Sequence, residues 1–126
     1  VGSGPMQSEL HKYAKDNNLK NVQFIKHIKN EKIFSLIKKA KFVVIPMMWF
    51  EFLPRVLIET LACGVPIITC NVGVMADIVK PRVHGLHFNI GDANDLSKKV
   101  LELNSDDELI KSMSLIDIYD EVLNAK

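Results

Sequence analysis

The sequence predicts an α/β fold in which a parallel β-sheet is flanked by helices, and two observations favour it. Short apolar segments alternate along the chain with amphipathic segments of about ten residues, the pattern of repeated strand–helix–strand units. The apolar segment 42–46 is continuous, as expected of a central parallel strand buried on both faces, and 66–70 is expected to be the next buried strand. The chain has 126 residues, enough for a core, so we expect a single domain over 1–126.

The first half of the chain begins this alternation. We expect a helix at 6–16, a short strand at 22–25, a helix at 31–39 capped by Asn30, and the strand at 42–46. The side chains expected on one face of the first helix are Met6, Leu10, Tyr13 and Ala14.

The second half continues it. We expect a strand at 66–70, a short helix at 75–79, an edge strand at 86–88, and helices at 94–103 and 106–123. The residues available to cap the helix at 94–103 are Asp92, Asn94 and Asp95. The histidines expected in a surface turn are His84 and His87. The lysines expected on solvated surfaces are Lys38, Lys39, Lys41, Lys98 and Lys99.

Composition excludes several function classes. The net charge of +1 gives no argument for binding nucleic acid or an anionic membrane, and no apolar run is long enough to span a bilayer. Residues 1–5 have neither the basic start nor the apolar middle of a signal peptide. Cys63 and Cys70 lie in or beside apolar segments, so we expect two buried thiols and a reducing, cytoplasmic compartment.

The segment 49–64 reads as a loop that turns into a helix. Pro54 suits the first helical position, where its missing N–H is not needed, and Gly64 ends the helix. We expect Glu59 on a flank of this helix, well away from the apolar stripe. The side chains expected on the buried face are Leu53, Val56, Leu57, Thr60 and Leu61.

Glu51 and Glu59 lie on either side of the start of this helix, with seven residues between them. The free first-turn N–H groups near Arg55 and Val56 point at the space between the carboxylates, and such a helix N-terminus binds anions. The spacing therefore fits a nucleotide-sugar, in which sugar, diphosphate and ribose follow one another. The alternative is a solvated helix in which Glu59 pairs with Arg55 at i−4.

Four loops are expected at one edge of the sheet. Ligands of parallel sheets bind at the carboxyl ends of the strands, and the loop with Glu51 follows such an end. The loops at 2–4, 27–28 and 71–73 follow other strands at the same edge. Their convergence favours a binding function for the carboxylate pair.

These residues match a known family. The run at 46–68, PMMWFEFLPRVLIETLACGVPII, resembles the donor-binding segment of the group 1 (family 4) glycosyltransferases, P-S-x-x-E-x-F-[GP]-x-V-x-x-E-A-x-A-x-G-x-P-V-[IV]. Residues 1–5 look like the family's V-G-x-G-P turn, and 85–92 look like its G-L-x-F-x-x-G-D. The resemblance covers 1 to about 103 and implies the Rossmann-like C-terminal, donor-binding half of a GT-B enzyme.

The resemblance implies a role for each matching residue. Glu51 would be the catalytic carboxylate that contacts the transferred sugar, and Glu59 would bind the ribose hydroxyls. The N–H groups of Arg55 and Val56 would hold the diphosphate. The other residues implied to bind substrate are Leu53 and Pro54 at the helix start, Gly2 and Gly4 near the phosphates, and His27 and Ile28 at the base.

The reaction implied is transfer of a sugar from a UDP- or GDP-linked donor to an acceptor hydroxyl, with retention of configuration and without a cofactor or metal. Three positions depart from the pattern: Met47, Leu53 and Thr60 stand where the family has Ser, Phe and Ala. Two strands, a helix, a basic pair and the acceptor domain of the family are not in this chain. We therefore expect a chain truncated at its N-terminus, with weak or no transfer in isolation.

Two alternatives remain open. The chain could be a non-catalytic, nucleotide-sugar-binding half that pairs with a separate acceptor subunit, which an exposed apolar face near Ile116 and Tyr119 would favour. It could also be a nucleotide-binding or structural module that has lost activity, although both Glu51 and Glu59 are retained. An unpaired sheet edge would be a site of self-association.

Overall fold

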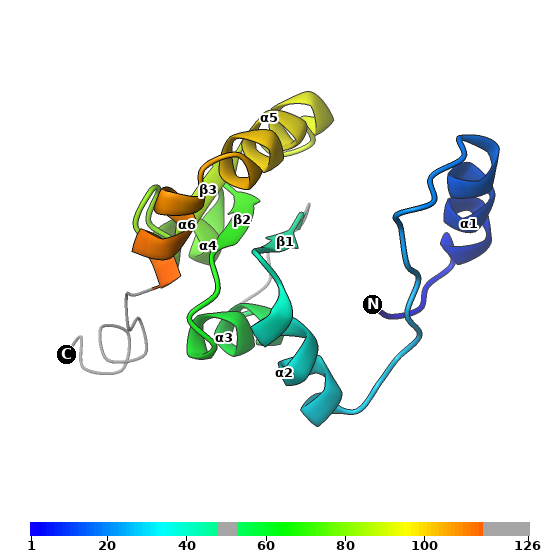
Figure 1. The fold of residues 1–126 in the computed structure, drawn as a ribbon, viewed down its shortest axis with the longest axis horizontal. Coiled ribbons are helices and arrows are strands. Elements are labelled where there is room, and N and C mark those ends of the chain that lie inside the picture. Colours follow the sequence, from blue (N-terminus) through cyan, green and yellow to red (C-terminus); the bar gives the residue numbers. More distant parts are fainter. Residues whose placement is uncertain (48–52, 115–126) are drawn as a thin grey trace. The chain divides into compact units, whose positions relative to one another are not determined.

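The computed structural model describes residues 1–47 and 53–114, shown in Figure 1. The chain divides into two compact units, Val1–Ile33 and Phe34–Lys126. Helix α2 (Asn30–Lys39) begins in the first unit and ends in the second. It starts one residue earlier than expected. No helix among the described residues is both long and apolar enough to cross a membrane.

The first unit contains helix α1 (Gln7–Asp16) and an extended segment that returns beside its own N-terminal residues. The N–H of Gly2 donates to the carbonyl of Ile25 at 2.7 Å, and the rings of His11 and Phe24 stack at 4.1 Å. The prediction of a strand at 22–25 is wrong. The hydrogen bond between Gly2 and Ile25 is not part of the repeated ladder that defines a sheet.

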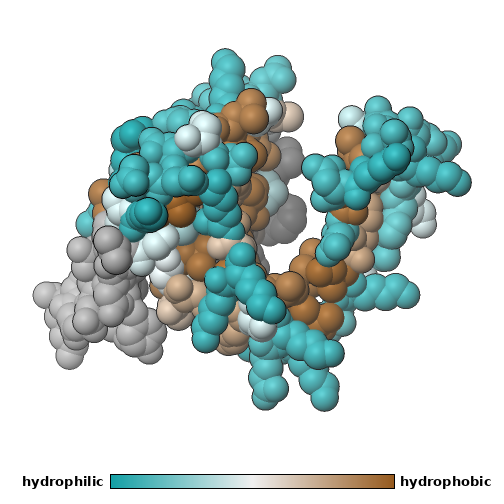
Figure 2. All heavy atoms as spheres, viewed as in Figure 1, coloured by the Kyte–Doolittle hydropathy of each residue, from teal (hydrophilic) through white to brown (hydrophobic). Residues whose placement is uncertain are grey.

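Helix α1 forms where the sequence predicts it, but none of its residues is buried. Leu10 and Tyr13 are exposed and Ala14 is half-buried. The apolar face predicted for α1 from the spacing of these residues is therefore not buried. Figure 2 shows mainly hydrophilic side chains over the outer surface of α1.

The second unit contains a parallel sheet of three strands in the order β1-β2-β3. Its strands are β1 (Val43–Ile45), β2 (Ile67–Cys70) and β3 (Gly85–Phe88). Ile45 pairs with Thr69 and Cys70 with Phe88, so all three strands end at the same edge. Four helices follow or connect them: α3 (Arg55–Ala62), α4 (Gly73–Ile78), α5 (Ala93–Asn104) and α6 (Asp107–Ser114).

Two apolar clusters cover the two faces of this sheet. Ile67 points to a cluster built with Leu57 and Leu61 of α3, and Ile68 points to a second cluster with Leu103 of α5 and Met113 of α6. Successive residues of a strand face opposite sides, so β2 is buried on both. Figure 1 shows α3 and α5 on opposite sides of the strands, which confirms the Rossmann-like layering.

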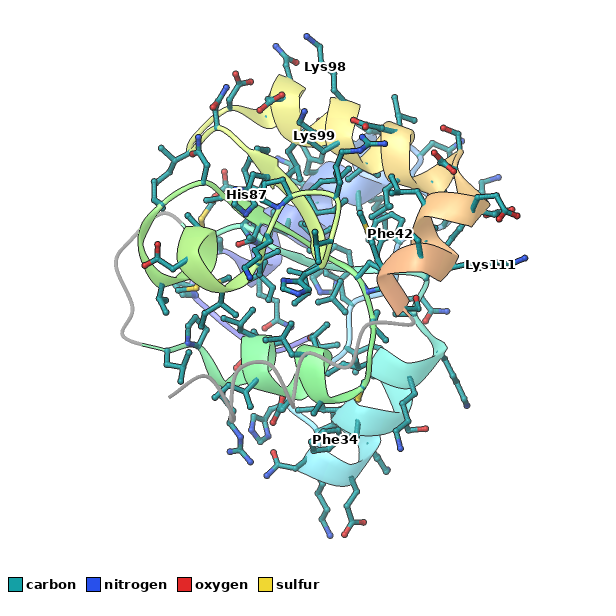
Figure 3. The ribbon with its side chains drawn as sticks, turned by 90° about the vertical axis from the view of Figure 1, so that its left-hand side faces the viewer. Phe34, Phe42, His87, Lys98, Lys99 and Lys111 are labelled. Carbon is teal, nitrogen blue, oxygen red and sulfur yellow. The ribbon has the colours of Figure 1, made fainter. Side chains whose placement is uncertain are left out.

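Strand β1 differs from the prediction that it is buried on both faces. It is an outer strand of the described sheet, and Val44 is 37% exposed while Ile45 is buried. Phe42, just before it, packs against the cluster that contains Ile68 (Figure 3). The continuous apolar run at 42–46 therefore does not mark a strand buried on both faces, whereas the segment at 66–70 forms the buried central strand β2.

The C-terminal helices begin with side-chain caps. Asp92 Oδ1 accepts from the N–H of Asp95 at 2.9 Å, which confirms Asp92 as the cap of α5. Asp106 Oδ1 accepts from the N–H of Leu109 at 3.0 Å and caps α6 in the same way. The structure describes α6 as far as Ser114, so the rest of the helix expected to 123 lies outside the described residues.

The structure buries His84, one of the two histidines expected in a surface turn. His84 is 2% exposed, and its Nδ1 lies 3.0 Å from the carbonyl of Ile78, while Nε2 of the half-buried His87 contacts the carbonyl of Val79. Lys41 is exposed, as expected, and its Nζ also donates to the carbonyl of Asn104 at 2.8 Å and pairs with Asp107 of α6. In Figure 3 Lys98 points away from the sheet, as expected.

Candidate functional site

The candidate site is centred on the start of α3. This helix joins β1 to β2, and because those strands are parallel its N-terminus lies at the edge where both strands end. Pro54 precedes the helix as its N-cap, with φ −63° and ψ 130°, so α3 begins one residue later than predicted. Pro54 is buried, so the entry of the chain into α3 is fixed by packing as well as by the ring.

The first turn of α3 is open to solvent. Among the described residues no side chain caps α3; the N–H of Leu57 donates to the carbonyl of Pro54 at 3.1 Å, and the N–H groups of Arg55 and Val56 precede the first intrahelical hydrogen bonds. Leu53 is 40% exposed and Val56 is 36% exposed, which makes the prediction of their burial wrong. The helix contacts the sheet through Leu57 and Leu61 instead, so the opening turn remains accessible to a ligand.

Glu59 lies about one turn further along, about 6 Å from Arg55 along the helix axis. It is 8% exposed, whereas the sequence predicted a flank position away from the buried stripe. The correction has a simple cause: α3 buries Glu59, Thr60 and Leu61 in succession, so its covered face is wider than the apolar stripe.

Arg55 is the ion-pair partner of Glu59 among the described residues. Arg55 Nε lies 3.0 Å from Glu59 Oε1, and the side chain of Arg55 is 71% exposed while that of Glu59 is 9% exposed. The pairing considered as an alternative in the sequence is therefore confirmed, but the solvated acid that it assumed is not. A mostly buried carboxylate is thus paired with an exposed cation.

This pair is not arranged for helix stability. A cation in the first turn opposes the helix dipole, and a cation N-terminal to an acid at i,i+4 is the weaker order of the two. Burial of Glu59 adds a desolvation cost that an exposed arginine offsets only in part. An arrangement that is unfavourable for the helix but favourable for an incoming anion is typical of a binding site.

The carboxyl edge continues across β2 and β3. Asn71, just after β2, donates from Nδ2 to Asn89 Oδ1 at 3.2 Å, and the N–H of Asn89 donates to Asp95 Oδ2 at 2.8 Å. The loop predicted at 71–73 therefore lies at the same edge as the entry to α3. Asn89 was missed in the sequence, where its only signal is its position directly after an expected strand.

The last two residues of β2 also face the chain that leaves β1. Thr69 Oγ1 donates to the carbonyl of Ile45 at 3.0 Å, and Cys70 Sγ donates to that of Met47 at 2.9 Å. Cys63 and Cys70 are both free thiols, with Cys70 buried and Cys63 half-buried. Burial raises the pKa of the Cys70 thiol, which keeps it protonated and able to donate.

The remaining predicted site residues belong to the first unit or lie outside the described residues. Gly2 and Gly4 are exposed residues of the first unit, and a Cβ added at either would meet no heavy atom within 4 Å. His27 is exposed and Ile28 half-buried in the same unit. Their participation in one site with α3 stays a prediction. Glu51, like Ile116 and Tyr119, lies outside the described residues.

Comparison with known proteins places the chain in a family. The sequence model described as "Glycosyl transferases group 1" matches residues 1–115. An uncharacterized glycosyltransferase of Methanocaldococcus jannaschii, MJ1178, is 29% identical over 113 residues, which make up 90% of this chain and 32% of that protein. The chain thus spans about a third of the length of this relative.

Solved structures share the fold. Sucrose-phosphate synthase from Thermosynechococcus elongatus matches with a TM-score of 0.82 and 25% identity over 98% of this chain and 32% of its own. Anabaena HepE in complex with UDP matches with a TM-score of 0.83 and 21% identity over 99% of this chain and 35% of its own. From the family match over nearly its whole length, the chain belongs to the group 1 glycosyltransferases and has the Rossmann-like fold of their GT-B structures.

Proposed function

We propose that this chain binds a nucleotide-sugar and forms the donor-binding part of an enzyme that transfers the sugar to an acceptor hydroxyl with retention of configuration. The observation that supports it most is the buried carboxylate of Glu59 beside the open first turn of α3. An anion-binding helix start and a hydroxyl-binding acid lie in the order that a diphosphate and a ribose require.

The diphosphate binds at the first turn of α3. The N–H groups of Arg55 and Val56 donate to its oxygens, and the exposed guanidinium of Arg55 adds a positive charge. Glu59 accepts hydrogen bonds from the ribose hydroxyls, and burial strengthens those bonds by excluding water. As the bond to the sugar breaks, the same N–H groups stabilise the charge that develops on the leaving diphosphate.

The other predicted site residues have proposed roles in binding the donor. Glu51 contacts the hydroxyls of the transferred sugar, Gly2 and Gly4 let the chain pass close to the phosphates, and His27 and Ile28 meet the base. The UDP complex of HepE supports a uridine nucleotide as the first ligand to test. Because the chain spans about a third of its relative's length, we expect it to bind the donor but to transfer little or no sugar in isolation.

Calorimetric titration of the chain with UDP and with GDP tests the site. Glu59→Gln should weaken binding of the preferred nucleotide by roughly 1–3 kcal/mol, since the charged acceptor of two hydroxyls is lost. Glu108→Gln is the control, because that acid on α6 is exposed and pairs with Lys111 three residues further along the helix. Equal affinities of the Glu59 variant and the control would contradict the ribose assignment.

A further inference from the structure

Arg55 belongs to two parts of the proposed nucleotide site at once. It is the first residue of α3, so its N–H lies in the open first turn, whereas its side chain reaches one turn further along the helix to Glu59. Arg55 Nε lies 3.0 Å from Glu59 Oε1. The backbone of this residue is therefore where the diphosphate is proposed to bind, and its charge is where the ribose is proposed to bind.

The ion pair covers the acid that it neutralises. The side chain of Glu59 is 9% exposed, while that of Arg55 is 71% exposed, so the guanidinium lies on the solvent side of the carboxylate. Oε1 of Glu59 is thus an acceptor that Arg55 already uses in the chain without ligand. A ribose that brings two hydroxyls to this carboxylate has to displace the guanidinium first.

The pair is weak enough to exchange its partner. An ion pair at i,i+4 on a helix with one exposed member changes an equilibrium only about twofold. The side chains of a helix lean toward its N-terminus, and a cation in the first turn opposes the helix dipole, so Arg55 is poorly placed while it reaches forward to Glu59. A diphosphate at the first turn removes this conflict and offers the guanidinium stronger, charge-assisted hydrogen bonds.

We propose that Arg55 is a specificity-determining residue that couples recognition of the diphosphate to recognition of the ribose. Without a ligand it blocks Glu59, and a diphosphate at the start of α3 draws the guanidinium away and leaves the acid to the ribose hydroxyls. This inference rests on the proposed function. It predicts that the site rejects free nucleosides, because a nucleoside brings the ribose without the negative charge that moves Arg55.

The dissociation constants of uridine and of UDP test the coupling, because these ligands share base and ribose and differ only in the phosphates. Guanosine and GDP are a second pair. In Arg55→Ala the affinity for UDP should fall about tenfold, since charge-assisted hydrogen bonds to the diphosphate are lost. The affinity for uridine should rise about twofold, since its ribose no longer competes with an ion pair. A cation that only attracts phosphate would leave uridine unchanged.

Three controls isolate the ion pair. Arg82→Ala removes another arginine–glutamate pair, in which Arg82 Nη1 lies 2.9 Å from Glu102 Oε1, at the opposite edge of the sheet just before β3. This variant should keep both affinities. 2′,3′-Dideoxyuridine lacks the ribose hydroxyls, so Arg55→Ala should not raise its affinity. Arg55→Lys keeps a cation at i−4 from Glu59 and should leave uridine as weak a ligand as it is for the original chain.

An affinity for uridine that is unchanged or lower in Arg55→Ala overturns the inference, whatever happens to UDP. So does a gain that dideoxyuridine shares, or the same pattern in Arg82→Ala. If the original chain binds neither UDP nor GDP, the proposed function itself fails. That result differs from a chain that binds a nucleoside diphosphate but gains no affinity for the nucleoside when Arg55 is replaced, in which case the proposed function stands and the coupling does not.

Discussion

Gly85 has no room for a side chain. It pairs with Ile67 across the sheet, and a Cβ added to it would lie 1.7 Å from the carbonyl oxygen of Ile67. The clash is with backbone, so β3 would have to move away from β2. Glycine is therefore required here by close approach of two strands rather than by an unusual backbone angle.

We expect Gly85→Ala to lower the free energy of unfolding by about 3 kcal/mol or more, because no side chain can turn aside to relieve the contact. Urea unfolding followed by circular dichroism measures the loss. Gly4→Ala is the control, since a Cβ there would meet nothing within 4 Å. Similar losses for the two variants would show that β2 and β3 are further apart than the structure has them.

The raised pKa of Cys70 gives stability a dependence on pH. In the unfolded chain a thiol has a pKa of about 8.5, whereas burial raises the pKa of Cys70 and keeps this thiol protonated to higher pH. Above the unfolded pKa the unfolded chain therefore holds fewer protons than the folded one, and the free energy of unfolding falls as pH rises. Below that pKa both states are protonated, and this group has no effect.

Comparison with Cys70→Ser isolates this contribution, because serine does not ionise and all other groups are shared. The original chain should lose more unfolding free energy than the variant between about pH 7 and about pH 10, by at most about 1.4 kcal/mol per pH unit. Urea unfolding at the two pH values measures the loss of unfolding free energy in each of the two proteins. Parallel losses in the two proteins would mean that the thiol ionises in the folded chain as readily as in water.

Among the helices, α5 has the best-defined start. Asp92 accepts from the N–H of Asp95, and Asp95 in turn accepts from the N–H of Asn89 just before the helix. Each acid thus satisfies a backbone donor on the other side of the helix boundary, as in a capping box. The sequence offered Asn94 as an equal candidate for the cap, but that residue lies inside the first turn.

Asp92→Ala should cost about 1 kcal/mol of stability, because one of the first-turn N–H groups of α5 loses its partner. Asn94→Ala, on an exposed residue two positions later, should cost less than about 0.5 kcal/mol. Chemical unfolding measures both values. The capping assignment would fail if the order of the two losses were reversed.

At the scale of the whole molecule, the sequence predicts best where one local signal suffices. The largely apolar segment of β2, the proline at the start of α3 and the acids before α5 each placed an element within one or two residues. It predicts poorly where burial depends on neighbours far along the chain. Whether both faces of β1 are buried depends on the order of the strands in the sheet. No local sequence pattern contains that order.

The candidate site shows the same division. The residue types and spacing of Arg55 and Glu59 were enough to predict their pairing, since i,i+4 neighbours on a helix meet whatever surrounds them. The burial of Glu59 and the hydrogen bond of Cys70 were missed. Both depend on how α3 and β1 pack against β2, and a short helix on a sheet buries more of its surface than its apolar residues indicate.

The central claim is that the open first turn of α3 binds the diphosphate of a nucleotide. Titration of the ¹⁵N-labelled chain with UDP and with GDP, followed by amide chemical shifts, tests it most directly. We predict saturable shifts that are largest at the amides of Arg55 and Val56, with the amides of Lys98 and Lys99 on α5 unchanged. Shifts that concentrate on α5 or α6, or that leave Arg55 and Val56 unmoved at saturation, would contradict the claim.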